Sequence, residues 1–81
     1  MTYVGKGYGW PRDATKYWRD VKTSTHCQAL CKEKYLKDNL WNSCSYYTTG
    51  KFCEAEKNVR GFTAASNYEF WRIIGENLFV L

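Results

Sequence analysis

Four cysteines, at positions 27, 31, 44 and 53 of an 81-residue chain, constrain the possible folds most strongly. A chain this short buries only about 60% of its unfolded surface, so a hydrophobic core alone stabilises it marginally. Small domains of this kind are usually held by disulfides or by a structural metal. The use of the four sulfurs is therefore the first question that the sequence raises.

Cysteine spacing separates three possible uses of these sulfurs. A four-cysteine zinc site usually has two short knuckles of the C-x₂-C type, whereas three, twelve and eight residues separate these cysteines. A thioredoxin-like redox site requires C-x-x-C beside a βαβ pattern, which this sequence lacks. We therefore expect two disulfides rather than a zinc site or a redox pair, and we expect no metal and no cofactor.

The segment that follows Thr25 reads as a helix. Thr25 and Gln28 fit a capping box, and the pattern weakens near Asp38. An apolar stripe at helical spacing is formed by Cys27, Leu30, Cys31 and Tyr35. A bridge between the first two cysteines would join one helix to itself, so both should pair outward. We favour the nested pairs Cys27–Cys53 and Cys31–Cys44, because the returning strand should meet the near end of the helix first.

The rest of the chain reads mainly as strands, which predicts one α+β domain over residues 1–81. A turn at "TTGK" (48–51) predicts a hairpin that carries Cys44 and Cys53 on its arms. The other expected segments are a short strand at 3–4, an irregular glycine-rich segment at 5–13, a strand at 16–21, a looser stretch at 56–67, and a hairpin formed by "YEFWRII" and "LFVL" around 75–77.

Two stretches, "VKTSTHCQALC" and "CSYYTTGKFCEAE", resemble the PAN/apple superfamily. The shared features are the V-x-T-x-x-x-C-x-x-x-C entry to the helix, a cysteine followed by two aromatic residues on a strand, and a last cysteine after a glycine turn. The resemblance covers residues 16–56 and implies one helix packed on a curled antiparallel sheet of about five strands, with two nested disulfides. The third disulfide of apple domains is absent, so the four-cysteine PAN branch is the closer analogue.

The resemblance also implies a function, that of an extracellular, non-catalytic binding module. Members of the superfamily bind carbohydrates or proteins, and in heparin-binding members basic residues lie before the helix and after its second cysteine. Those places hold Arg19, Lys22, Lys32 and Lys34 here. The expected ligand is a carbohydrate, either lectin-like or an anionic glycan such as heparin. The alternative is a protein-interaction module or a small secreted protein ligand, with the basic residues merely solvated.

Aromatic residues near the N-terminus form a second candidate site. "GYGWPRD" and "KYW" bring together Tyr8, Trp10, Arg12, Asp13, Tyr17 and Trp18. Aromatic rings stack on sugar faces, and of this group we assign Trp10, Arg12 and Tyr17 to ligand binding. The competing interpretation places the rings in the core, and for Trp10 we favour the core, since a solvent-facing loop normally avoids such side chains.

The C-terminal strand offers apolar side chains to both of its faces. Phe70 and Trp71 are adjacent, so they should point to opposite sides of the sheet. We therefore expect apolar surface to remain outside the face covered by the helix. Such a surface favours a partner protein, a neighbouring domain of a longer chain or self-association.

Several function classes are not favoured by the sequence. His26 is the single histidine, and the eight carboxylates are scattered without an apolar frame, so no catalytic group is suggested. A net charge of +4 is too mild to indicate specific nucleic-acid binding, and no apolar run is long enough for a membrane span. The first ten residues do not resemble a signal peptide. Because the resemblance implies a secreted protein, we expect its signal peptide not to be part of this sequence.

Overall fold

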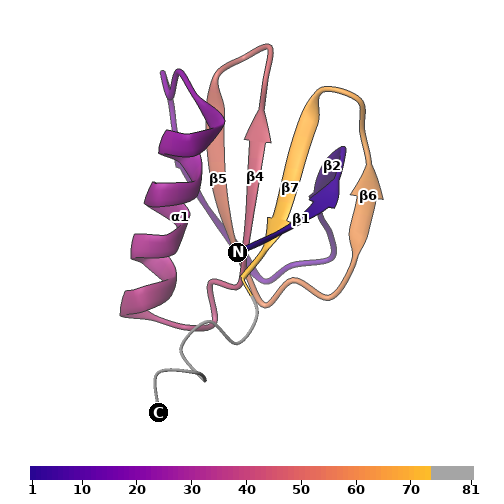
Figure 1. The fold of residues 1–81 in the computed structure, drawn as a ribbon. Helices are drawn as coiled ribbons and strands as arrows, with labels where there is room; N and C mark the ends of the chain where they lie inside the picture. The colour runs from indigo at the N-terminus through magenta and orange to yellow at the C-terminus, as the bar shows by residue number, and fades with distance from the viewer. Residues whose placement is uncertain (74–81) are drawn as a thin grey trace.

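A computed structural model describes residues 1–73, which form one helix and seven strands (Figure 1). The α+β class is confirmed, and the expected strand "LFVL" with its turn at 75–77 lies outside the described residues. In chain order the elements are β1 (Thr2–Gly5), β2 (Gly7–Gly9), β3 (Ala14–Trp18), α1 (Ser24–Lys37), β4 (Ser43–Tyr47), β5 (Phe52–Lys57), β6 (Phe62–Ala64) and β7 (Tyr68–Arg72).

Five strands of the described chain form an antiparallel sheet, which confirms the expected number of strands; their order is β1-β7-β4-β5-β3. The sheet is not strongly curled, which corrects the expected curl. Bulges bend strands and increase their twist. Within residues 1–73 the register shifts only in the edge strand β1, between Tyr3 and Gly5, so the central strands stay regular.

Strand β3 is displaced from the expected strand at 16–21. It begins at Ala14 and ends at Trp18, because Asp20 has a φ of 57°, in the left-handed region that interrupts an extended strand. The hairpin at residues 48–51 is confirmed, since β4 and β5 pair directly on either side of it.

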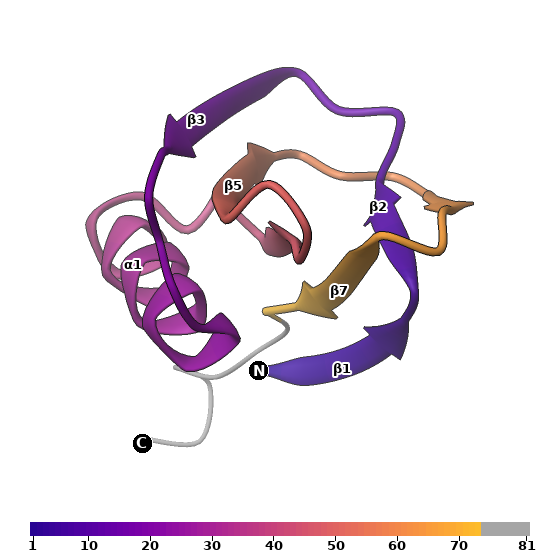
Figure 2. The ribbon, with the colours of Figure 1, turned by 90° about the horizontal axis from the view of Figure 1, so that it is seen from above.

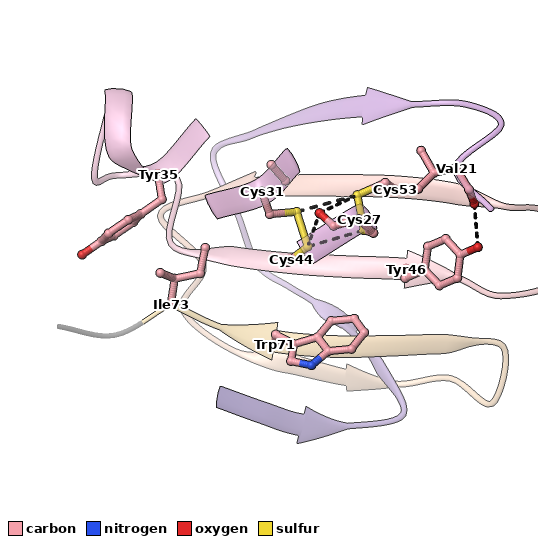
Figure 3. Packing of buried hydrophobic residues seen from close by; sticks show 10 residues of the cluster. Val21, Cys27, Cys31, Tyr35, Cys44, Tyr46, Cys53, Trp71 and Ile73 are labelled. Atoms are coloured by element: carbon pink, nitrogen blue, oxygen red, sulfur yellow. Dashed lines mark hydrogen bonds between the residues drawn. A yellow bond between two sulfur atoms is a disulfide. The ribbon is translucent and has the colours of Figure 1, made fainter. Parts of the chain in front are cut away.

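Helix α1 packs on one face of the sheet and is joined to it by both disulfides (Figure 3). Cys27 pairs with Cys53 and Cys31 with Cys44, which confirms the nested connectivity; the Cα atoms lie 5.3 and 5.7 Å apart. The two bridges lie side by side, with sulfur contacts of 3.5 Å (Cys27 to Cys44) and 3.8 Å (Cys31 to Cys53). Around them the core is completed by Val21, Tyr35, Tyr46, Ala55, Trp71 and Ile73.

The opposite face of the sheet carries a second layer, the antiparallel pair β2–β6 (Figures 1 and 2). The expectation of an irregular segment at 5–13 is therefore wrong for Gly7–Gly9. Glycine is required there, because a Cβ on Gly7 would lie 2.2 Å from the carbonyl oxygen of Thr63. A Cβ on Gly9 would lie 2.9 Å from the Phe70 ring.

This second layer also covers an apolar side chain of β7, on the face away from the helix. Phe70 and Trp71 point to opposite faces, as predicted, with Trp71 in the core beneath α1. Phe70 is only 1% exposed and packs against Phe62, with ring centroids 5.4 Å apart. Apolar surface nevertheless remains outside the face covered by the helix, as expected, at Trp10, Tyr17 and Phe62. The strand pair β2–β6 shields apolar side chains on this face, and α1 shields those on the other face.

Candidate functional site

A cleft of about 460 Å³ opens on the sheet face opposite the helix. Cys53 points toward α1, so its neighbour Glu54 points to the opposite face, and Tyr17 is paired with Glu54 across β3 and β5. The N-terminal segment, residues 7–12, passes over this face and contributes Tyr8, Trp10 and Arg12 to the cleft. The cleft is lined by Tyr8, Trp10, Arg12, Tyr17, Glu54 and Tyr68.

Aromatic rings form most of the cleft wall. Trp10 is 53% exposed and Tyr17 is 56% exposed, so both offer ring surface to solvent. Tyr8 contacts Tyr68 with ring centroids 5.2 Å apart, and the Arg12 guanidinium lies over the rings of both Tyr8 and Trp10, at 5.9 and 5.5 Å. These cation–π contacts help to hold the side chains of Tyr8 and Trp10 in place.

The placement of Trp10 corrects the expectation that it belongs to the core. The space beneath the N-terminal segment is filled by Phe70 and Val59, which are 1% and 3% exposed and pack against Gly9. Trp10 lies just beyond these residues, with its backbone N–H bonded to the carbonyl of Gly61. It therefore lines the cleft instead.

Arg12 links the cleft to a buried polar network. Its Nη1 donates to Glu54 Oε1 at 2.8 Å and to Glu56 Oε2 at 3.1 Å. Glu56 is fully buried and also accepts hydrogen bonds from the hydroxyls of Ser43 and Ser45. Burial, reinforced by the charge of Glu54, raises the pKa of Glu56 to about 7, although the serine hydrogen bonds and Arg12 oppose the shift.

Three residues assigned to ligand binding from the sequence, Trp10, Arg12 and Tyr17, meet in this cleft. Glu54 and Tyr68 were not anticipated as lining residues. Glu54 could have been found by strand alternation, since it follows a cysteine that must face the helix. Tyr68 carries no such signal, because its place depends on the pairing of β7 with β4.

The four basic residues assigned from the sequence do not share one hollow. Arg19 lies over the Phe52 ring at 5.1 Å, and together with Tyr17 and Phe52 it lines a hollow of about 180 Å³. Lys34 lies over the Trp41 ring at 4.7 Å and lines a different hollow, of about 220 Å³. Lys22 is exposed before α1, and Lys32 is exposed two positions from Lys34, which places the two on different sides of the helix.

The hollow beside Lys34 contains basic residues that were not among those assigned. It is lined by Lys16, Trp18, Leu30, Glu33, Lys34 and Lys37. Glu33 and Lys37 are an exposed ion pair at 3.6 Å, so part of the positive charge is balanced there. Trp18 also packs against the core and so does not belong to the aromatic cleft on the other face.

Two disulfides indicate that the protein folds in an oxidising environment. Within residues 1–73, no helix has the length and apolar character needed to cross a membrane. Comparisons of the chain with protein-family models, with curated proteins and with solved structures found no match.

Proposed function

We propose that this protein is an extracellular, non-catalytic binding module of the PAN/apple type that binds a carbohydrate in the aromatic cleft. The observation that carries the proposal is the set of aromatic rings that surround the Arg12–Glu54 pair at the cleft. Small-molecule sites are typically concave, mostly apolar, and supplied with a few placed polar groups. At about 460 Å³ the cleft falls within the usual range for such sites.

The chemistry of the lining residues supports a sugar as the ligand. A pyranose ring has an apolar C–H face that packs on an aromatic ring, and its edge carries hydroxyls that donate and accept hydrogen bonds. Trp10 and Tyr17 present exposed ring surface, while Arg12 and Glu54 offer donors and an acceptor.

The carboxylates support a binding role rather than catalysis. Most glycosidases use two carboxylates that both reach the scissile bond. Glu54 lines the cleft, whereas Glu56 is fully buried beneath it and occupied by Arg12, Ser43 and Ser45. The membership in the PAN/apple superfamily is supported by the nested disulfides that join one helix to two neighbouring strands.

A glycan array with the oxidised domain, followed by titration calorimetry on the hits, tests the proposal. We expect Trp10→Ala to weaken glycan binding by at least about tenfold, because the sugar loses its stacking surface. The melting temperature should change little, because Trp10 is half exposed.

The matched control is Leu36→Ala, which removes a similarly exposed apolar side chain, on the helix and outside the cleft. This variant should bind like the wild type. Binding of an extracellular protein but of no glycan would contradict the proposal and favour the protein-interaction alternative. Unchanged glycan affinity in Trp10→Ala would also contradict it, because the glycan would then bind outside the cleft.

A further inference from the structure

The two charged residues that line the cleft, Arg12 and Glu54, restrict the chemistry of the ligand more than the aromatic rings do. Glu54 lines the cleft although it is only 4% exposed, and its Oε1 accepts the hydrogen bond from Arg12. Its second oxygen, Oε2, accepts no hydrogen bond from residues 1–73. Among residues 1–73, the polar side-chain atom that is both buried and without a hydrogen-bond partner is Arg72 Nε. Glu54 Oε2 has no partner in this range either, but it is not sealed from solvent, so a ligand can reach it.

Arg12 is likewise only partly used by the protein. Its Nη1 makes both bonds to the carboxylates, and within residues 1–73 its other guanidinium N–H groups have no acceptor. A guanidinium has five N–H donors in a fixed plane. Arg12 and Glu54 are joined by the 2.8 Å hydrogen bond from Nη1 to Oε1, so the remaining N–H groups of Arg12 and the Oε2 atom of Glu54 lie beside each other as a donor and an acceptor.

The charges around the cleft oppose an anionic ligand. Arg12 and Glu54 cancel, and the other lining residues (Tyr8, Trp10, Tyr17 and Tyr68) are neutral. Glu56 lies directly behind Arg12 and adds negative charge when it is ionised. A carboxylate or sulfate on the ligand would have to compete with both glutamates for Arg12 while facing Glu54 in a partly desolvated space.

We propose that the Arg12–Glu54 pair recognises two adjacent hydroxyls of a neutral pyranose, and that Glu54 is the residue that excludes uronic, sialic and sulfated sugars. This inference rests on the carbohydrate-binding function proposed above. One hydroxyl donates to Glu54 Oε2, and the oxygen of its neighbour accepts from the Arg12 guanidinium. Adjacent hydroxyls of a pyranose can engage a neighbouring donor and acceptor together, because each hydroxyl can both donate and accept.

Matched sugars test the inference on the wild-type protein. The methyl glycosides of glucose, galactose and mannose are compared with the glycosides of the corresponding uronic acids, which differ by a carboxylate at C6. We expect the best neutral glycoside to bind at least about tenfold more tightly than its uronic acid. Equal or tighter binding of the uronic acid would overturn the inference while leaving the carbohydrate-binding function intact.

Glu54→Gln then separates recognition from a structural role. The amide keeps the size of the side chain but removes the charge, so we expect about tenfold weaker binding of the neutral glycoside. The preference for neutral over uronic glycosides should fall to less than about threefold, because the repulsion is lost. A merely structural role for Glu54 would weaken both ligands equally and would overturn the inference.

Glu33→Gln is the matched control, since it neutralises an exposed helix carboxylate that does not line the aromatic cleft. It should keep both affinities and the preference. If Glu54→Gln does not fold, the wild-type comparison decides. If neither class of sugar binds to the wild-type protein, the proposed function itself fails, and the inference fails with it.

Discussion

Glu56 is a carboxylic acid that is fully buried in the folded domain. Its carboxyl accepts bonds from two serine hydroxyls and from Arg12. A buried carboxylate is costly even when it is paired. The result is the pKa of about 7, which burial raises first and the charge of Glu54 raises further.

This pKa predicts a pH-dependent stability. Between 4.5, the ordinary pKa of glutamate, and about 7, the folded protein holds a proton that the unfolded chain releases. The stabilisation is therefore fully present below pH 4.5 and is lost as the pH rises through 7, by at most about 3 kcal/mol. Urea unfolding of the wild type should give a lower free energy of unfolding at pH 8 than at pH 5.

The variant Glu56→Gln has no proton to lose at this position. We expect its free energy of unfolding to change less between pH 5 and pH 8 than that of the wild type. Glu33→Gln, which alters an exposed carboxylate, should keep the wild-type dependence. Identical pH dependence in Glu56→Gln and the wild type would show that Glu56 does not titrate in this range.

The N-terminal end of helix α1 is set by its capping residue, and this residue differs from the expected one. The expected cap was Thr25, but the cap is Thr23, whose Oγ1 accepts the N–H of His26 at 3.1 Å. A cap must have extended backbone angles, and Thr23 has φ −134° and ψ 152°, whereas Thr25 is already helical. Gln28 accordingly donates to the carbonyl oxygen of Ser24 rather than completing a capping box with Thr25.

Two threonine variants test this boundary against each other. Thr23→Ala should lower the free energy of unfolding by about 1 kcal/mol, because the N–H of His26 loses its acceptor. Thr25→Ala should change it by less than about 0.5 kcal/mol, because alanine is a good helix former and no cap is lost. Guanidinium unfolding measures both. A larger loss in Thr25→Ala than in Thr23→Ala would show that the helix begins at the later position.

The molecule as a whole consists of a sheet covered on both faces. Helix α1 covers one face and is joined to it by two disulfides, while β2–β6 lies on the other face (Figure 2). The cleft is on that second face. Disulfides stabilise mainly by restricting the unfolded chain, and more so for longer loops. In a domain of 81 residues this contribution is large relative to the total stability.

Removing the disulfides one at a time tests this contribution. Replacing Cys31 and Cys44 with alanine should cost about 3 kcal/mol. Replacing Cys27 and Cys53 should cost about 0.6 kcal/mol more, because their sequence separation is 26 rather than 13. Thermal unfolding of the two double variants gives the comparison, and peptide mapping without reduction checks the pairing. Four titratable thiols in the native protein would contradict the disulfide framework.

Much of the fold could be predicted because its determinants are close together in the chain. The cysteine spacing of four, the stripe that ends at Tyr35 and the glycine turn at 48–51 identify α1, the β4–β5 hairpin and the bridges between them. The site was predicted in part for the same reason. Trp10, Arg12 and Tyr17 lie within eight positions, so a local cluster was visible before their contacts were known.

The remaining features depend on competition between segments that are distant in the chain. Whether Trp10 is core or cleft is set by Phe70 and Val59, which fill the space under Gly9 and leave no room for an indole. Tyr68 reaches the cleft through the pairing of β7 with β4. The buried carboxylate of Glu56 is held by Arg12 and by two serines of β4, which are distant from it in the chain. Local patterns specify helices, turns and strand faces, because their energies come from neighbouring residues. Which side chain occupies a shared space follows from packing that involves the whole chain, and this is why the cleft emerges only with the folded sheet.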